Sequence, residues 1–393
     1  VIEDMPFLVD SVRMAVNRCN LQLLRVIHPI VSVRRDAEGQ LVEVLERNSG
    51  AQEAQREAAI HLEIVRQTDK SVLEELAAEL VRVLEDVRRA VEDWQPMRDA
   101  LASVVQEIET RASPLDAADV AESLAFLRWL AAGHFTFLGY RLYELSGEGG
   151  EEALRIVPGS GLGILRAHPK AVASRAFASL PPELRARARV PELLILTKAN
   201  ARATVHRPAN LDYVGIKRFD PEGRVRGEHR FLGLYGSRAY NCLPQEIPLL
   251  RRKVQSVIER ADLEPNSHSA KELAHILETY PRDELFQITE EDLFRIAMGI
   301  MALSEEQRPR LFLRRDPYGR YIMCLVYAPR ESYDTEVRKR MQAILQETFN
   351  ATEVEFTVSL SESVLARIMF TVRTRPGKIP AYDPREIEAR LAD

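Results

Sequence analysis

The sequence predicts an α+β fold made of repeated ferredoxin-like βαββαβ units, with antiparallel sheets and connecting helices. Three segments share one pattern, Arg-x-Asp-x-x-Gly followed by a polar residue, at 34–40, 218–224 and 314–320. Runs of β-forming residues flank these segments, and stretches with apolar residues at helical spacing lie nearby. A supersecondary unit used three times accounts for these observations. The length of 393 residues is sufficient for two or three domains.

The shared pattern has the chemistry of a tight turn. Its Asp can accept hydrogen bonds from the backbone that follows, and its Gly can adopt the left-handed conformation that closes the turn. In the second and third copies a Pro follows the Asp and presets φ for the turn. We therefore predict that Gly39, Gly223 and Gly319 each lie in a turn between neighbouring antiparallel strands.

The third copy predicts a complete unit. Its expected elements are a strand at 283–288, a helix at 290–303, hairpin strands at 310–315 and 321–327, a helix at 334–349, a strand at 353–360 and an extra strand at 364–373. Thr289 is the expected helix cap, with Asp292 completing a capping-box-like pair. Without the extra strand, this order is that of the ferredoxin-like unit.

The first copy predicts the same order with its leading strand cut short, because Val1 and Ile2 already have the character of a strand end. Its expected elements are a helix at 6–18, a second strand within 21–35, a third strand that begins at 41–45 and resumes at 60–68, and an inserted loop at 46–59. Ser71 with Glu74 is expected to open a long helix that runs to Trp94. We expect the chain to be a piece of a longer protein.

The middle of the chain predicts a ββα core around the second hairpin. The expected strands are at 135–145, 193–197, 213–219 and 230–235, and the expected helices at 117–130 and 248–261. The rest of this region does not assemble into a complete unit from the sequence pattern alone.

Composition and charge exclude several classes of protein. The 54 Lys and Arg residues are nearly balanced by 59 Asp and Glu residues, which argues against nucleic-acid or membrane-surface binding by the chain as a whole. No stretch approaches the roughly 18 apolar residues of a transmembrane helix. Cys19, Cys242 and Cys324 lie far apart and form no disulfide framework, which predicts a reducing, cytoplasmic setting.

The sequence offers weak candidates for a cofactor or metal site. The Gly-rich loop at 159–163 follows a short strand, but Pro169 stops any helix early, so we expect a turn that needs backbone freedom. His268 and His275 are seven residues apart, whereas metal ligands on one helix usually lie three or four apart. We therefore expect no catalytic, cofactor-binding or metal-binding residue in this chain.

Two other functional classes are compatible with the sequence. A small free-standing hydrolase would need a convergent cluster of side chains from Arg207, Asp212, His229 and Arg238. A ferredoxin-like RNA-binding module would stack bases on strand aromatics, for which the candidates are Phe312, Tyr321 and Tyr327. No RNA-binding signature run accompanies these aromatics, so we interpret them as core residues.

The segment at 1–12, with Asn20 after the following helix, resembles the ACT-domain pattern Asp-x-Pro-Gly followed by apolar residues. ACT domains are ferredoxin-like modules that bind amino acids at the strand-to-helix turn of paired units, where free helix N–H groups can receive a carboxylate. The resemblance implies effector-binding candidates at Asp4, Asp10 and Ser11. Phe7 stands where the family usually has Gly, and a purely structural unit is the alternative.

The resemblance suggests a division into four parts. We expect a first ACT-like domain at 1–95, a helical linker at 96–133, a second ACT-like domain with insertions at 134–265 and a third ACT-like domain at 266–380.

Five longer segments resemble the large bacterial NAD-dependent glutamate dehydrogenases. They are at 4–11, 135–140, 206–215, 230–235 and 281–287. The resemblance implies an N-terminal regulatory region of an enzyme that oxidises L-glutamate to 2-oxoglutarate and ammonium with NAD. The catalytic domain would lie downstream, and no position here matches the family's catalytic motifs.

The leading hypothesis is therefore a non-catalytic regulatory and oligomerisation region. Its implied partners are its own downstream catalytic domain, further copies of the chain and an amino-acid effector, with NAD bound elsewhere in the parent enzyme. A scaffold for subunit assembly without a ligand is the alternative from another class.

Overall fold

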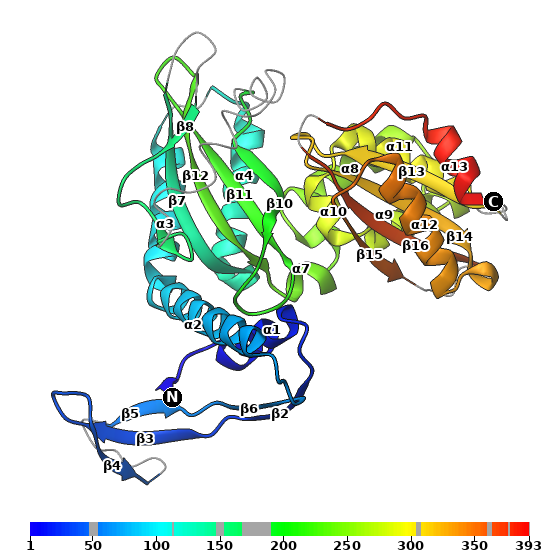
Figure 1. The fold of residues 1–393 in the computed structure, drawn as a ribbon. Helices are drawn as coiled ribbons and strands as arrows, with labels where there is room; N and C mark the ends of the chain where they lie inside the picture. The colour runs from blue at the N-terminus through cyan, green and yellow to red at the C-terminus, as the bar shows by residue number, and fades with distance from the viewer. Residues whose placement is uncertain are drawn as a thin grey trace.

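The α+β class is confirmed. The computed structural model describes residues 1–46, 54–111, 114–146, 153–166, 190–303, 308–359, 364–375 and 378–392. All strand pairs in these ranges are antiparallel, and helices separate three sheet-containing regions (Figure 1).

The first unit has a four-stranded sheet, a separate two-stranded sheet and two helices. Its elements are β1 (Ile2–Glu3), α1 (Leu8–Arg18), β2 (Leu23–Ile27), β3 (Ile30–Arg35), β4 (Leu41–Leu45), β5 (Gln55–Ala58), β6 (His61–Ile64) and α2 (Lys70–Glu92). The sheet order is β1-β5-β3-β4, and β2 pairs with β6 beyond it. Asp69, two residues before the predicted Ser71, caps α2 because its side chain accepts from Ser71 N. Strands β2 to β6 form an arm that extends from the body (Figure 1).

The second region is a six-stranded sheet. Its strands are β7 (Phe135–Ser146), β8 (Ala153–Ile156), β9 (Leu162–Gly163), β10 (Leu194–Arg202), β11 (Asn210–Phe219) and β12 (Val225–Tyr235), in the order β10-β11-β12-β7-β8 with β9 on β7. Helices α3 (Trp94–Thr110) and α4 (Ala117–Trp129) cover one face. Helices α1 and α2 cover the other face, where Val83 and Val87 share a core with Leu138 and Leu232.

The predicted ββα core of this region is confirmed, because β11 and β12 are followed by α7 (Arg238–Asn241) and α8 (Leu250–Ala261). The expected βαββαβ order is not found here. Among the described residues no helix separates β7 from β12, and the helices on the sheet come from residues before it. The division into domains stays a prediction.

After the short helix α7, four further helices of the described residues lie between the second and third sheets. They are α8, α9 (His268–Thr279), α10 (Arg282–Gln287) and α11 (Glu290–Met301). The strand predicted at 283–288 is wrong, because these residues form α10. Pro281 precedes the helix and Asp283 and Glu284 occupy its first turn, a pattern that favours a helix start. The predicted Thr289 cap of α11 is confirmed, since its side chain accepts from Asp292 N.

The third region is a permuted ferredoxin-like unit. Its elements are β13 (Arg310–Arg315), β14 (Tyr321–Pro329), α12 (Thr335–Thr348), β15 (Glu353–Ser359), β16 (Leu365–Arg373) and α13 (Pro384–Ala392), and its sheet order is β13-β14-β16-β15. The segment predicted as an extra strand, β16, holds the central place that the first strand holds in the ordinary order. Helices α12 and α13 cover one face, while α9 and α11 cover the other.

The three predicted hairpin turns are confirmed. Gly39, Gly223 and Gly319 all have positive φ, and each donates its N–H to the carbonyl of the Asp three residues earlier. In each turn the Asp carboxylate also accepts from the backbone N–H four residues on. The turns join β3 to β4, β11 to β12 and β13 to β14.

Candidate functional site

The predicted effector turn packs against the second region. Phe7, the residue before α1, has φ of 71°, which is the left-handed region that Gly favours. Its ring lies 4.9 Å from the ring of His206. Ser11 is buried, and its Oγ accepts a hydrogen bond from His206 N at 3.1 Å. The turn is therefore held by a loop of the same chain.

Asp4 and Asp10 have different surroundings from Ser11. The Asp4 carboxylate lies 3.0 Å from the Arg56 guanidinium. Asp10 is exposed on the first turn of α1. The three candidates thus lie at one turn but in three different environments: Asp4 pairs with Arg56, Ser11 is bonded to His206, and Asp10 is exposed. Effector binding by these residues stays a prediction.

A buried polar cluster lies where the second region meets α10. Lys198 Nζ of β10 lies 2.6 Å from Asp212 Oδ1 of β11 and 3.0 Å from Asp283 Oδ1 of α10. Tyr240 OH donates to the same Asp283 oxygen at 2.8 Å. Asp212 Oδ2 accepts from Tyr235 N at 3.0 Å. We call Lys198, Asp212, Tyr240 and Asp283 the α10 cluster.

Burial and pairing set the charges of the α10 cluster. Burial alone would lower the pKa of Lys198, but the carboxylates of Asp212 and Asp283 raise it above its ordinary value. Burial raises the pKa of Asp212 to about 6, against the pull of Lys198. Lys198 therefore stays charged at neutral pH and holds two elements together through two carboxylates.

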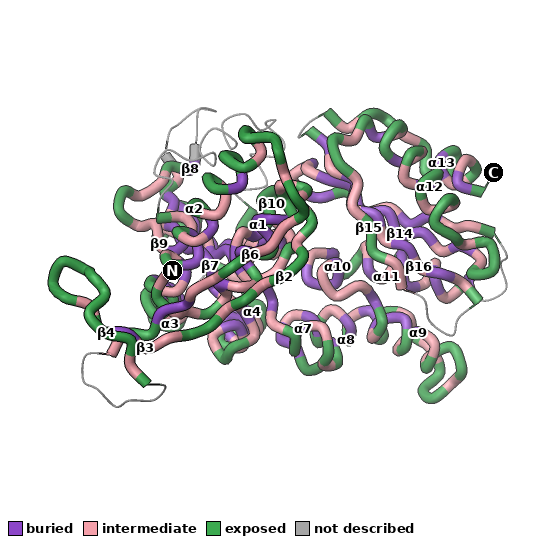
Figure 2. Tube along the Cα trace, turned by 60° about the horizontal axis from the view of Figure 1, so that its bottom comes forward, coloured by how far each residue is buried: buried purple, intermediate pink, exposed green. Residues whose placement is uncertain are grey.

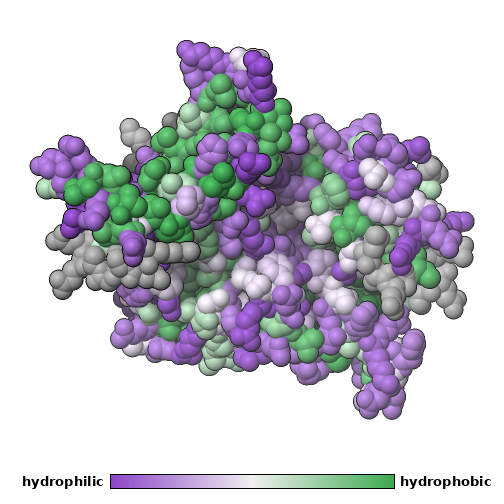
Figure 3. Space-filling view, turned by 90° about the horizontal axis from the view of Figure 1, so that it is seen from below, coloured by the Kyte–Doolittle hydropathy of each residue, from purple (hydrophilic) through white to green (hydrophobic). Residues whose placement is uncertain are grey.

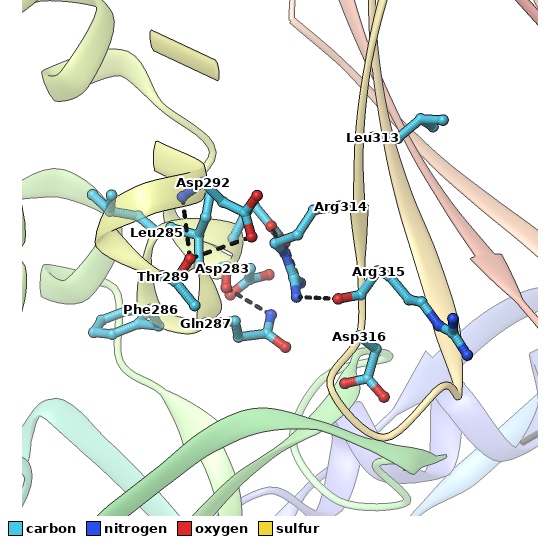
Figure 4. Close-up of polar contacts among 12 residues, drawn as sticks. Asp283, Leu285, Phe286, Gln287, Thr289, Asp292, Leu313, Arg314, Arg315 and Asp316 are labelled. Carbon is cyan, nitrogen blue, oxygen red and sulfur yellow. Dashed lines mark hydrogen bonds and ion pairs between the residues drawn. The ribbon is translucent and has the colours of Figure 1, made fainter. Parts of the chain in front are cut away.

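A second buried pair joins α10 to the third sheet. The Arg314 guanidinium of β13 donates to both oxygens of Glu284, and Arg314 Nη2 also lies 3.2 Å from Tyr321 OH. Figure 4 shows the Arg314 side chain directed from its strand toward α10. Both side chains of this ion pair are almost fully buried, at 3% and 4% exposure.

The side chain of Gln287 links the second sheet, α10 and the third sheet. Its Oε1 accepts from Thr197 Oγ1 and Lys198 N, each at 3.1 Å, and from Tyr321 OH. Its Nε2 donates to Asp283 O at 2.8 Å (Figure 4). One amide thereby satisfies polar groups of the second sheet, α10 and the third sheet.

Lys253 of α8 closes the other end of α10. Its Nζ donates to the carbonyls of Leu285, Phe286 and Ile288 at 3.1, 3.1 and 2.8 Å. A cation at a helix C-terminus also complements the helix dipole. Burial lowers the pKa of Lys253 to about 8.

A cleft of about 280 Å³ opens beside the α10 cluster. It lies between the ends of β10 and β11 and the strands β15 and β16, and we call it the β10–β16 cleft. Arg202 Nη2 lies 2.6 Å from Glu355 Oε1 across it, and Asn210 Nδ2 donates to Glu355 Oε2 at 2.7 Å. Arg373 also faces Glu355, at 3.7 Å. The cleft thus offers guanidinium groups and carboxylates within one small volume.

Sequence reasoning missed Lys198, Tyr240, Lys253, Glu284 and Arg314. One signal was available for Arg314, which shares the alternation phase of Phe312 in β13 and therefore faces the same side. A charged residue at an inward position predicts a buried partner. The sequence pattern does not say which residue that partner is.

The Gly-rich loop at 159–163 has the turn role that was predicted. Gly159 and Gly163 have positive φ, and a Cβ on Gly163 would lie 2.2 Å from Leu138 O. Gly163 N donates to Asp93 Oδ2, and Ile164 N donates to Leu138 O. These amides are engaged inside the chain, so the loop does not fit a dinucleotide phosphate.

The structure does not assemble the residues that a hydrolase would need. Asp212 belongs to the α10 cluster and lies opposite Gly233, while His229 lies opposite Ile216, farther along the strand, and contacts Tyr140. Arg207 donates to Tyr235 O, and Arg238 is exposed. Of the strand aromatics considered for RNA stacking, Phe312 and Tyr327 pack into the core with α9 and α11, and buried Tyr321 contacts Arg314 and Gln287.

Comparisons with known proteins match three parts of the chain to family models. Residues 1–80 match "Glutamate dehydrogenase, ACT1 domain", residues 247–306 match "Glutamate dehydrogenase, helical motif 1", and residues 310–393 match "Glutamate dehydrogenase, ACT2 domain". The first match covers the first unit as far as residue 80 in α2, the third covers the third unit, and the second covers α8 to α11.

Three curated relatives, each named NAD-specific glutamate dehydrogenase, are similar over almost the whole chain. The Halomonas elongata protein is 41% identical over 99% of this chain, the Pseudomonas aeruginosa protein 38% over 99%, and the Mycobacterium tuberculosis protein 31% over 95%. The alignments cover 24%, 24% and 22% of those relatives, so the chain spans about a quarter of their length. Among the described helices, none has the length and apolarity needed to cross a membrane.

Proposed function

The chain belongs to the NAD-specific glutamate dehydrogenase family, and on that premise we propose that it is the regulatory and assembly region of such an enzyme. In this proposal a catalytic domain elsewhere in the full-length protein converts L-glutamate, NAD and water to 2-oxoglutarate, ammonium and NADH in the cytoplasm. The matched ACT1 and ACT2 domains support a regulatory role. No step of hydride transfer is assigned to the described residues.

We place the effector in the β10–β16 cleft, and the charges that face each other there carry the proposal. An amino acid has one carboxylate and one ammonium group. Arg202 and Arg373 can receive the carboxylate, while Asp283 and Glu355 can receive the ammonium. A cleft of about 280 Å³ has room for a molecule of this size.

Binding in this cleft would act on the contact between two regions. Arg202 and Asn210 belong to the second region and Glu355 belongs to the third, so their contacts join the two. A ligand that takes these partners changes how firmly the regions are held. A typical coupling of about 1–3 kcal/mol is enough to shift a two-state equilibrium substantially.

Titration calorimetry of the full-length protein with a panel of amino acids tests the proposal. We expect at least one amino acid to bind, and Arg202→Met and Glu355→Gln each to weaken it at least tenfold. Arg224→Met, at an exposed turn of the second hairpin, is the matched control and should bind normally. Binding that both cleft variants leave unchanged would contradict the cleft, and no binding by any amino acid would contradict effector regulation here.

The first turn is the second candidate position for the effector. Asp10→Asn alters the exposed carboxylate of the predicted set and leaves the Ser11 contact with His206 in place. If Asp10→Asn lost amino-acid binding while the cleft variants bound normally, the effector site would be assigned to the turn that holds Asp4, Asp10 and Ser11.

Assembly is supported by the apolar surface of the arm. Leu24, Val42 and Val44 are each more than half exposed, and β4 is an edge strand. Figure 3 shows apolar residues gathered on the left, the side on which the arm lies in Figure 1. We propose that the arm contacts another copy of the chain.

A further inference from the structure

A small pocket lies at the other end of β10 and β11 from the β10–β16 cleft, where α3 ends. Its volume is about 50 Å³, and its lining includes Glu107 and Arg111 of α3, Arg218 of β11 and His229 of β12. Arg218 lies opposite Gly227 in the strand register. A Cβ on Gly227 would lie 2.4 Å from Tyr143 O, so the close approach of the neighbouring strand requires glycine at this position.

The hydrogen-bond donors of this pocket are incompletely used. Arg218 Nε and Nη1 are buried and have no hydrogen-bond partner in the described structure. His229 is 8% exposed and its Nδ1 is shared with Tyr140 OH at 2.9 Å, while its Nε2 is buried without a hydrogen bond. Burying an N–H group without a partner costs free energy because the group loses its hydrogen bond to water, so natural structures rarely leave such groups unpaired.

The charges around Arg218 leave an excess of positive charge. Its nearest charged neighbours are two guanidinium groups, of Arg111 and Arg226, and two carboxylates, of Glu107 and Glu144. Glu144 Oε1 lies 3.8 Å from Arg218 Nη1, and Glu107 Oε2 lies 3.9 Å from His229 Nε2, so neither replaces a hydrogen bond. Among the described residues, three guanidinium groups thus face two carboxylates, an excess of one positive charge.

Lys217 also lines the pocket but is not part of this excess. Its Nζ donates to Val190 O at 2.7 Å and lies 3.1 Å from Glu192 Oε1.

We propose that this pocket binds one small anionic group, a carboxylate or a phosphate oxyanion, between Arg218 and His229. The buried, unpaired Nε–H and Nη1–H of Arg218 lie on different edges of the guanidinium, so either can supply a charge-assisted donor to the anion, and His229 Nε2–H can supply a second donor. The volume exceeds the roughly 30 Å³ of one liquid water and suits a single head group. The rest of a larger ligand would extend past Arg111 and Arg226, which are largely exposed.

Protonation of His229 should be coupled to the anion. Burial and the charge of Arg218 lower the pKa of His229 to about 4, with Glu107 acting in the opposite sense and Arg226 in the same sense as Arg218. A bound anion would raise this pKa, so the affinity should increase as the pH falls toward 5.

Equilibrium dialysis of the full-length protein with labelled inorganic phosphate, and competition by acetate, tests the site. We expect Arg218→Met to bind one phosphate fewer per chain than wild type, and His229→Gln to weaken that site about tenfold. Arg224→Met, an exposed Arg on the same hairpin, is the control. Displacement by acetate would assign the site to carboxylates, and no displacement would assign it to phosphate.

Two outcomes would overturn the proposal. One is equal phosphate stoichiometry in wild type and Arg218→Met. The other is binding of neither phosphate nor acetate at millimolar concentration, which would mean that the pocket holds only water. Arg218→Lys keeps the positive charge but not the guanidinium group, and it is the control for misfolding of Arg218→Met. Partial binding of phosphate by Arg218→Lys would show that the loss in Arg218→Met comes from the missing charge and not from a folding defect.

Discussion

The first and third hairpins have the same turn and opposite surroundings. In both, an Asp carboxylate accepts from the turn amides and a Gly with positive φ closes the turn. The first hairpin stands on the exposed arm, whereas β14 of the third is buried on both faces (Figure 2). Local turn chemistry therefore determines that a hairpin forms, while the packing of the hairpin depends on charged residues with partners far away in the sequence.

The ion pairs of the two hairpins provide the largest expected difference. Glu284→Gln removes the counter-charge of buried Arg314, so we expect local stability to fall by about 3–5 kcal/mol. Glu43→Gln breaks a pair with Arg34 whose side chains are about half exposed, and should cost at most about 1 kcal/mol. Hydrogen exchange of peptides covering β14 and β3 in the full-length protein measures both. Equal losses of stability in Glu284→Gln and Glu43→Gln would contradict the expected difference between the buried and the exposed ion pair.

The turn carboxylates should differ next. Asp316 is buried and binds Arg320, which also donates to Thr197 Oγ1 at 2.6 Å. Asp316→Ala leaves buried donors unpaired and should cost about 2–3 kcal/mol. Asp36→Ala, at the exposed turn, should cost about 1 kcal/mol or less. Hydrogen exchange of the same peptides measures both losses of stability. A larger loss in Asp36→Ala than in Asp316→Ala would contradict the expected difference between the two turns.

The contribution of buried Lys253 to the free energy of unfolding should depend on pH. Its pKa is lowered by burial from 10.5 to about 8, while Glu284 acts to raise it and Arg314 to lower it. Between these values the unfolded chain binds more protons than the folded chain, so this group's contribution to stability rises with pH. The slope should reach at most about 1.4 kcal/mol per pH unit.

We therefore expect wild type to gain stability relative to Lys253→Met between pH about 8 and about 10, measured as the difference between their urea midpoints. Lys70→Met, at the exposed start of α2, controls for the loss of one positive charge. A difference that falls as the pH rises would contradict the buried ammonium.

The turn glycines should behave alike despite their different surroundings. Gly39 and Gly319 have φ of 79° and 62°. Replacing either with Ala places a side chain in the left-handed region, at a cost of about 1–2 kcal/mol. Local exchange rates measure both losses. A much larger loss at Gly319 would show that packing, and not backbone conformation, dominates there.

The smallest effect on stability is expected on the arm. Val44→Thr changes an exposed side chain and should alter stability by less than about 0.5 kcal/mol. If the arm contacts another copy of the chain, the variant should nevertheless dissociate more readily in sedimentation velocity. Unchanged association would remove this face of the arm from the assembly proposal.

Much of the fold could be predicted because its signals are local. The turns at Gly39, Gly223 and Gly319, and the Thr289 cap, depend on residues within a few positions of one another. The strand predicted at 283–288 failed because six residues are too few to show a clear period, although Pro281 and two acidic residues were helix-start signals. The order of the third sheet also escaped prediction, since pairing is not encoded in alternation.

The candidate site was less predictable because its residues lie far apart in the chain. Lys198, Asp212 and Asp283 meet only after β10, β11 and α10 have been placed together. The proposed effector turn could be located from the sequence, but the loop with His206 that holds Ser11 could not. An inward-facing charge such as Arg314 can be recognised from its strand, and its partner cannot.

The position of β16 in the third sheet has a consequence for synthesis on the ribosome. This strand lies between β14 and β15 but leaves the exit tunnel after both of them. Until it emerges, the nascent chain presents β14 and β15 without the neighbour that pairs with each. This unit can close only when its last strand has been translated, and ribosome-associated chaperones have their best opportunity to bind just before that moment.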